Sequence, residues 1–204
     1  MSIKAIVFDF GQVISFPPDV KMVKSLAELA GVEPEKFEPV LWSLRGEWDR
    51  GTITVDEYFR RVLARLNVSR DAKTIEEMIK IDQASWQNIN GGTVALMEDI
   101  KRAGYILGIL SNMPHEFLAM ARKKFPVFAL PQVSLFSCEL NLLKPEEAIY
   151  RKLLSAAGVK GEELVFFDDN HENVTSAAAL GIKALLWKNP DHARLELSAL
   201  GVRL

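Results

Sequence analysis

Lys4-Ala-Ile-Val-Phe-Asp-Phe-Gly-Gln-Val13 is the segment that best indicates how the chain folds. The apolar run from Ala5 to Phe8 is typical of a short strand buried on both faces of a sheet, and we expect Gly11 to supply the permissive backbone of a tight turn. Asp9 then stands at the carboxyl end of a buried strand, where open α/β sheets bind their ligands. A lone acidic residue at a strand end is more often a turn former than a catalyst, so the rest of the chain must decide the role of Asp9.

The composition is that of an ordinary globular protein without a dominant charge. Of the 204 residues, 49% are hydrophobic and 25% are charged, and the net charge is -2. This balance argues against an electrostatic surface for nucleic acid, and no apolar stretch reaches the length of a membrane span. We therefore expect a cytoplasmic monomer or homodimer without nucleic-acid or membrane partners. The single Cys138 has no disulfide partner or metal-ligand companion, which favours a buried apolar role.

Residues 17–89 carry the pattern of consecutive helices. Apolar residues recur at helical spacing from Val20 to Ala30. Thr54-Val-Asp-Glu57 and Thr74-Ile-Glu-Glu77 have the spacing of capping boxes, and each predicts the start of a helix. Residues 45–51, which are rich in charge, are predicted to form a loop. The sequence thus predicts an all-helical segment that follows the first strand.

From residue 93 onward, predicted strands alternate with predicted helices. The strands are expected over residues 105–110, 133–137, 164–167 and 184–187. Strands joined by helices of this length form right-handed crossovers in a mostly parallel sheet covered on both faces. The predicted fold class is therefore α/β, with a doubly wound, mostly parallel sheet in a core of residues 1–16 and 90–204 and an all-helical cap domain of residues 17–89 inserted into it.

Polar groups follow the predicted strands at several points along the chain. They are Asp9, the pair Ser111-Asn112, Lys144 before Pro145, and the pair Asp168-Asp169. The carboxyl ends of parallel strands lie at one edge of the sheet, so these groups are expected to converge. One carboxylate can act as a nucleophile, others can hold a hard cation, a hydroxyl can bind phosphate, and a lysine can neutralise charge. These are the parts of a site that transfers a phosphoryl group through an aspartyl phosphate.

Each of these groups also has a plain structural explanation. Ser111 and Asn112 can cap the helix that follows them, and an isolated Lys144 is more often a solvated surface lysine. Asp168 and Asp169 can belong to a polar loop before a helix, whose N-terminus favours negative charge. These explanations account poorly for the occurrence of all the groups at strand ends.

The four motifs, in this order, resemble those of the haloacid dehalogenase-like hydrolase superfamily. They are Asp9-Phe-Gly-Gln-Val13, Leu110-Ser-Asn112, Lys144-Pro, and Phe166-Phe-Asp-Asp-Asn-His-Glu-Asn-Val174. The resemblance covers essentially the whole chain, and the helical insertion is similar to the α-helical cap of that superfamily. The first and last motifs together resemble its α-glucose-1-phosphate phosphatase-like branch.

The resemblance implies a Mg²⁺-dependent phosphatase that acts on a small phosphorylated metabolite such as a sugar phosphate. The resemblance implies that Asp9 is the nucleophile and a Mg²⁺ ligand, and that the Gly11 carbonyl and Asp169 are further ligands of the ion. It implies that Ser111 and Asn112 bind the phosphate. Lys144 would orient Asp9 and stabilise the charge of the transferring group, and Asp168 would support this network. Asn173 occupies a place where many relatives have an aspartate, which implies a lower metal affinity.

Two features of the sequence bear on how such an enzyme would work. Gly11 stands where phosphatases of the superfamily usually carry a second aspartate that handles protons, so another group or solvent must do so. Arg45 and Trp48 lie in a segment that is placed to close over the site and select the substrate, although Trp48 is equally expected to pack inside the helical segment. His115 and His171 follow two of the motifs, but surface positions without function are expected for both.

Other functions fit parts of the same pattern. A 2-haloacid dehalogenase needs the aspartate nucleophile but no metal, and the Asp168-Asp169 pair argues against it. A receiver-like signalling module uses the same residue types, but its acidic pair precedes the phosphoacceptor along the chain. A protein that binds phosphorylated ligands without turnover would explain the glycine at position 11.

Overall fold

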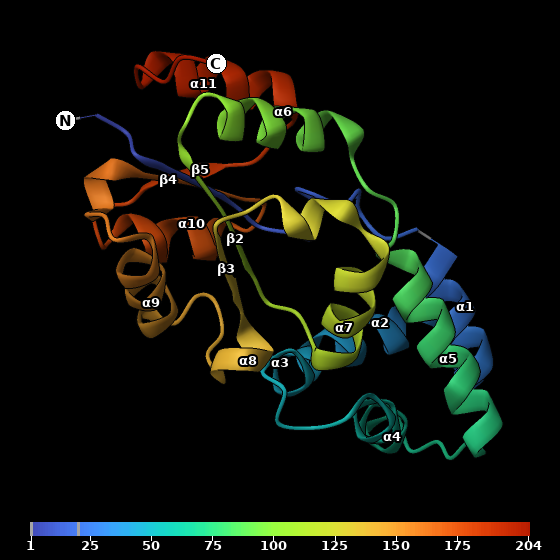
Figure 1. The fold of residues 1–204 in the computed structure, drawn as a ribbon. Helices are drawn as coiled ribbons and strands as arrows, with labels where there is room; N and C mark the ends of the chain where they lie inside the picture. The colour runs from blue at the N-terminus through green and yellow to red at the C-terminus, as the bar shows by residue number, and fades with distance from the viewer. Residues whose placement is uncertain (1, 20) are drawn as a thin grey trace.

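The computed structural model describes residues 2–19 and 21–204, and in this part of the chain the strands form a five-stranded parallel sheet (Figure 1). The strands are β1 (Ala5–Phe8), β2 (Ile106–Ser111), β3 (Val133–Phe136), β4 (Leu164–Asp168) and β5 (Lys183–Leu186). Their order in the sheet is β3-β2-β1-β4-β5, so β1 is central and pairs in parallel with both β2 and β4. The predicted doubly wound α/β fold is confirmed.

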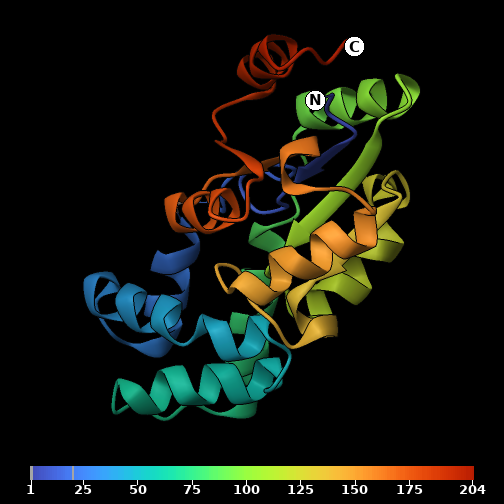
Figure 2. The same ribbon diagram turned by 90° about the vertical axis from the view of Figure 1, so that its left-hand side faces the viewer.

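Helices cover both faces of the sheet (Figures 1 and 2). One face packs against α6 (Gly91–Arg102), α7 (His115–Lys124) and α11 (Pro190–Ala199), and the other against α9 (Glu147–Ala157) and α10 (His171–Ala178). The short elements η1 (Pro126–Ala129), α8 (Ser137–Leu140) and η2 (Gly161–Glu163) lie in the connections. Ile6 and Phe8 point to the first face, whereas Ala5 and Val7 point to the second, because side chains alternate along a strand. The apolar run of β1 is thus explained by burial on both sides.

Within the described residues, five further helices lie beyond one end of the sheet, between β1 and α6 in the chain (Figure 2). They are α1 (Lys21–Ala30), α2 (Pro34–Ser43), α3 (Arg45–Asp49), α4 (Val55–Arg65) and α5 (Ala72–Ser85). We call them the helical unit. Their buried side chains, among them Phe37, Trp48 and Tyr58, form a hydrophobic cluster separate from the two that flank the sheet. The division of the chain into a core and a cap domain at residues 17 and 89 stays a prediction.

The two chain segments that join the helical unit to the sheet run side by side. Ser15 and Ile89 form an antiparallel bridge. The Phe16 N–H donates to the Asn88 carbonyl at 2.8 Å, and the Asn90 N–H donates to the Ile14 carbonyl at 2.9 Å. Both chain termini lie at the opposite end of the molecule, near α11 (Figure 1). Among the described residues, no helix combines the length and the apolar character needed to cross a bilayer.

Three local predictions were wrong. Residues 45–49 form helix α3 rather than a loop, because tertiary contacts such as that of Trp48 with Glu116 at 3.0 Å hold the segment, and Arg45 adds a bond to Asp49 one turn later. Helix α5 is capped by Asp71, which accepts from the Thr74 N–H at 2.8 Å, so Thr74 is not its cap. The residue with left-handed backbone in the first turn is Gln12, with φ of 58°, and not Gly11.

Thr54 caps α4 as predicted, since it accepts from the Glu57 N–H at 3.2 Å. The reciprocal bond of a capping box is not formed among the described residues, and Glu57 accepts from Arg61 instead, at 2.7 Å. The expected helix from Val20 begins at Lys21, and Val20 itself lies outside the described residues.

Candidate functional site

The site lies at the carboxyl edge of the sheet, where the chain order of the strands reverses. After β1 the chain adds β2 and β3 on one side, and it then crosses to add β4 and β5 on the other. Open α/β sheets bind ligands at such a reversal. Asp9 directly follows β1, and its N–H donates to the Phe167 carbonyl of β4 at 2.9 Å. The carboxylates of Asp9 and Asp168 are thereby held next to each other.

Lys144 is buried between these two carboxylates. Its Nζ lies 2.8 Å from Asp9 Oδ1 and 2.6 Å from Asp168 Oδ2. Only the Asp168 contact has hydrogen-bond alignment, so the contact with Asp9 is an ion pair. Burial alone would lower the pKa of Lys144, but the charges of Asp9 and Asp168 outweigh burial and raise it. Lys144 is therefore a buried, charged lysine and not a solvated surface residue.

Asp168 has its oxygens occupied by protein donors. Its Oδ1 accepts from the Asn170 N–H at 2.8 Å and from Asn173 Nδ2 at 2.9 Å, while Oδ2 accepts from Lys144. An aspartate at position 173 would have no N–H to donate to Asp168, which explains the use of an amide there. Asp168 and Asn173 therefore form a buried network that holds Lys144 in place.

Asp9 and Asp169 bear an excess of negative charge. Asp9, Asp168 and Asp169 each offer one oxygen within a group whose atoms lie within 4.8 Å of one another. Burial raises the pKa of Asp9 to about 7, with Asp168 and Asp169 adding to this and Lys144 opposing it. Burial and Asp168 also raise the pKa of Asp169, to about 6. Three carboxylates and one ammonium group thus share a poorly hydrated space, which favours a further cation.

Gln12 is a member of the site that the sequence prediction missed. Its Nε2 donates to Asp169 Oδ2 at 2.7 Å, across 157 residues of chain. Gln12 has left-handed backbone, and its side chain reaches the residue that follows β4. No spacing in the sequence indicates this contact, because it depends on the conformation of the turn.

Ser111 and Asn112 do not cap α7, whose N-cap is Pro114 with no side-chain hydrogen bond. Asn112 instead pairs with the backbone of Lys144: Nδ2 donates to the Lys144 carbonyl at 2.9 Å, and Oδ1 accepts from the Lys144 N–H at 2.8 Å. Ser111 is buried at the end of β2 and lines the cavity. The Asn112 side chain is therefore engaged with the Lys144 backbone, while the Ser111 hydroxyl lies 3.5 Å from the Asn112 carbonyl at the cavity wall.

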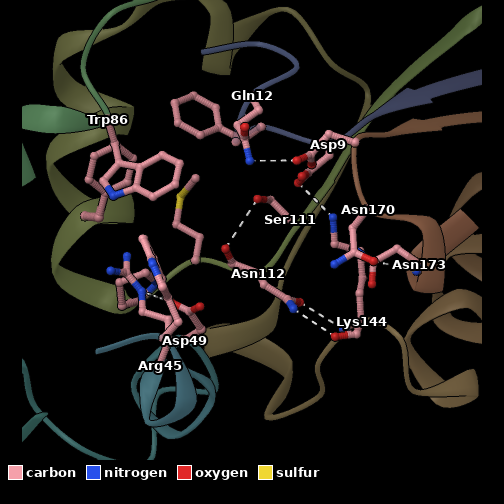
Figure 3. A pocket seen from close by; sticks show the side chains of 17 residues that line it. Asp9, Gln12, Arg45, Asp49, Trp86, Ser111, Asn112, Lys144, Asn170 and Asn173 are labelled. Carbon is pink, nitrogen blue, oxygen red and sulfur yellow. Dashed lines mark hydrogen bonds and ion pairs between the residues drawn. The ribbon is translucent and has the colours of Figure 1, made fainter. Parts of the chain in front are cut away.

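A cavity of about 320 Å³ lies between this edge and the helical unit (Figure 3). Its walls from the sheet side include Asp9, Gly11, Gln12, Ser111, Asn112, Lys144, Asp169 and Asn173. The opposite wall consists of Trp42, Arg45, Asp49 and Trp86. Met113, which precedes α7, and Phe117 in its first turn also line the cavity. Every predicted residue of the sheet edge except Asp168, which lies behind Lys144, lines this one cavity.

The two residues predicted for substrate selection have different positions. Arg45 lines the cavity, and its guanidinium lies 4.3 Å from the centre of the Trp48 ring. Trp48 is fully buried in the helical unit, and its Nε1 donates to Glu116 of α7 at 3.0 Å. Trp48 therefore packs against the guanidinium of Arg45 and does not line the cavity.

The aromatic wall of the cavity consists of Trp42 and Trp86, which meet edge to face at a centroid distance of 6.4 Å. Trp86 Nε1 is buried without a hydrogen-bond partner among the described residues. Trp86 follows α5 and belongs to no motif, so packing alone brings it to the site. His115 and His171 are exposed and do not line the cavity, and Cys138 is buried in the core, as expected.

One protein family matches most of the chain. The family described as haloacid dehalogenase-like hydrolase matches residues 3–181. Phosphatase MT3486 from Mycobacterium tuberculosis (strain CDC 1551 / Oshkosh) is 27% identical over 220 residues, an alignment that covers 100% of this chain and 98% of the phosphatase.

Solved structures show the same fold. The HAD family enzyme bt-2542 from Bacteroides thetaiotaomicron superposes with a TM-score of 0.75 at 22% identity, covering 96% of this chain and 99% of that enzyme. Its complex with magnesium and inorganic phosphate superposes with a TM-score of 0.71 at 22% identity, covering 92% and 96% of the two chains. The L-2-haloacid dehalogenase RSc1362 gives 0.71 at 20% identity, covering 91% and 86%. With the family match over residues 3–181, these findings show that the chain belongs to the haloacid dehalogenase-like hydrolases.

Proposed function

We propose that this hydrolase is a Mg²⁺-dependent phosphatase that cleaves a small phosphorylated metabolite, such as a sugar phosphate, through an aspartyl-phosphate intermediate. The observation that carries the proposal is the contact of Lys144 with both Asp9 and Asp168 beside the acidic group that includes Asp169. A phosphatase from M. tuberculosis that aligns along the whole chain supports it. We also propose that the enzyme acts in the cytoplasm as a monomer or homodimer.

The residues present fit a magnesium ion. Asp168 is occupied by three protein donors, whereas Asp9 and Asp169 each have one oxygen contacted by a protein donor and a second oxygen left for a cation. The Gly11 carbonyl would be a third ligand. Hard oxygen ligands of this kind suit Mg²⁺, and the related enzyme bt-2542 was crystallised with magnesium and inorganic phosphate. When bound, Mg²⁺ would supply the positive charge that lets an anionic carboxylate approach an anionic phosphate ester.

The residues of the chain would act in a defined order. The Ser111 hydroxyl donates a hydrogen bond to a phosphate oxygen and so orients the ester. An oxygen of Asp9 attacks phosphorus while Lys144, charged and buried, stabilises the negative charge of the transferring group. Asn112 and Asp168 keep Lys144 in position through its backbone and its ammonium group. Water then releases phosphate and regenerates Asp9.

The cavity sets a limit on the substrate. A volume of about 320 Å³ is at the small end for ligand pockets and fits a compact phosphorylated metabolite. Trp42 and Trp86 offer aromatic faces for the apolar side of a sugar ring, and Arg45 offers donors for its hydroxyl groups. We assign substrate selection to these residues.

Substitution of the nucleophile tests the proposal. Asp9→Asn keeps the shape of the side chain but removes the nucleophilic carboxylate, so hydrolysis of p-nitrophenyl phosphate should fall to background, and EDTA should abolish the activity of the wild-type enzyme. Asp191→Asn, an exposed change on α11, should leave activity unchanged. Full activity of Asp9→Asn would refute the proposal. Release of chloride from a 2-haloacid in the presence of EDTA would instead indicate a dehalogenase.

A further inference from the structure

The proposed phosphatase lacks a proton donor at its usual place beside the nucleophile. An alkoxide is a poor leaving group unless it gains a proton as the P–O bond breaks, and the water of the second step must lose one. Gly11 has no side chain, and the space beside it is taken by an indole: a Cβ at Gly11 would lie 3.4 Å from Trp86 Cζ3. A proton supplied by the protein must therefore come from another wall of the cavity.

Asp49 is the only carboxylate of the helical unit that lines the cavity, among the residues described. Asp9 and Asp169, the other carboxylates in the lining, belong to the sheet edge. Asp49 enters from the opposite wall, beside Arg45 (Figure 3). Its Oδ1 accepts from Arg45 Nε at 3.0 Å, while Oδ2 has no protein hydrogen bond among the described residues and is not enclosed. Asp49 thus presents one oxygen to a ligand.

Helix α3 holds Asp49 firmly against the sheet side of the cavity. Ser137 Oγ donates to the Asp49 carbonyl, and the same Oγ accepts from the Met113 N–H at 2.9 Å. On one side Trp48 bonds Glu116, and on the other the Arg50 guanidinium bonds Glu146 and the Asn141 carbonyl, the latter at 2.9 Å. The residues before and after Asp49 are therefore both anchored to the core.

The surroundings of Asp49 favour retention of a proton. Burial raises its pKa, and Asp82 adds to this, whereas Arg45 and, more weakly, Lys144 lower it. The positive charge of Arg45 does not neutralise Asp49 alone, because Arg45 Nη1 also bonds the buried Asp82 at 2.9 Å. One guanidinium thus balances two carboxylates, and the remaining charge is most easily removed by a proton.

We propose that Asp49 is the general acid and base of the reaction, an assignment that rests on the proposed phosphatase activity. In the first step, the Asp9–phosphorus bond forms as the bond from phosphorus to the leaving oxygen breaks, and the protonated Asp49 carboxyl gives its proton to that oxygen. In the second step, water attacks phosphorus, its proton returns to the Asp49 carboxylate, and the Asp9–phosphorus bond breaks. Atoms and charges balance without any other reactant.

The test compares esters that differ in their need for an acid. Asp49→Asn should lower kcat/KM for glycerol 1-phosphate by about 10²- to 10⁴-fold but should lower kcat/KM for p-nitrophenyl phosphate far less, because p-nitrophenolate leaves without a proton. The variant should also release a burst of p-nitrophenol, since the water of the second step has lost its base. Asp49→Ser provides a second variant with the same expected pattern should Asp49→Asn fold poorly.

Asp82→Asn is the matched control, because it removes the other carboxylate that binds Arg45 but does not line the cavity. It should change kcat/KM for both esters by the same factor. Equal losses on both esters in the Asp49 variants, or an Asp82→Asn pattern that matches theirs, would show that Asp49 only positions Arg45 and would overturn the inference. If the wild-type enzyme released phosphate from neither ester, the proposed function itself would fail.

Discussion

At the scale of single residues, the site depends on charge that the protein neutralises only in part. Lys144 balances one negative charge among Asp9, Asp168 and Asp169. The pKa values of Asp9, about 7, and Asp169, about 6, are above their ordinary value of 3.8. The folded protein therefore holds these protons more tightly than the unfolded chain. The corresponding stabilisation is complete below pH 3.8 and is lost as the pH rises through 6 to 7.

The tight binding of protons by Asp9 and Asp169 predicts that stabilisation of the protein by Mg²⁺ depends on pH. The ion must displace protons from Asp9 and Asp169 at about pH 5.5 but not at about pH 8, so the rise in Tm at a fixed Mg²⁺ concentration should be larger at the higher pH. Thermal unfolding at both pH values, with Mg²⁺ or with EDTA, measures this rise in Tm. Asp169→Asn should remove most of the difference. An equal rise at both pH values would contradict the assignment of these carboxylates to the ion.

The sequence predicts the position of a site residue where the topology of the sheet alone determines that position. Asp9, Ser111 and Asp168 could be brought together from the sequence, because the carboxyl ends of parallel strands share one edge. Gln12 and Trp86 could not, since one reaches the site through a left-handed turn and the other through packing between distant helices. Contacts of that kind have no periodic signature along the chain.

At the scale of elements, the loop before α9 is held by the loop after β2. The Asn112 amide forms two hydrogen bonds with the Lys144 backbone. Asn112→Ala removes both and should cost about 1–3 kcal/mol of stability, because the Lys144 N–H and carbonyl lose their partners. It should also lower kcat for p-nitrophenyl phosphate, since Lys144 is no longer held beside Asp9.

Substitution of a helix cap separates the loss of stability from the loss of kcat. Asn189 caps α11 by accepting from the His192 N–H at 2.9 Å, far from the cavity. Asn189→Ala should cost about 1 kcal/mol, comparable to the lower end expected for Asn112→Ala, without a change in kcat. Urea unfolding and steady-state kinetics on both variants give the comparison. A loss of kcat in Asn189→Ala as large as in Asn112→Ala would mean that stability alone explains the effect.

The element that the sequence failed to predict is also the one that carries Asp49. Helix α3 has five residues, too few for an apolar period to be visible, and two of them, Arg45 and Asp49, bond each other across its single turn. Its position depends on anchors in distant segments, such as Glu116 and Glu146. Local pattern therefore indicated a loop, whereas tertiary contacts stabilise a helix.

At the scale of the whole molecule, the helical unit and the sheet have separate hydrophobic clusters. Phe37→Ala removes a fully buried ring from the helical unit and should cost about 3–5 kcal/mol locally. We expect hydrogen exchange to speed up in α1 to α5 while β1, β2 and β4 keep their protection, because opening of the helical unit need not open the sheet. This outcome would support the predicted division of the chain at residues 17 and 89.

A ring in the sheet serves as the control for that measurement. Phe166→Ala removes an equally buried side chain from β4, and it should lower protection in the strands themselves. If Phe37→Ala lowered protection in the strands as much as Phe166→Ala does, the chain would unfold as one cooperative unit, and the predicted division would be wrong.

The bridge between Ser15 and Ile89 brings the two ends of the helical unit together on the sheet side. Contacts of Trp48 with Glu116, and of Ser137 with the Asp49 carbonyl, fix helix α3 to the core at a second place. In the proposed mechanism the acid and the nucleophile therefore come from parts of the chain with separate hydrophobic clusters, and these contacts keep them together. Loosening the contacts would leave a phosphoryl group on Asp9 without a base to activate water, so it would slow the loss of the intermediate more than its formation from p-nitrophenyl phosphate.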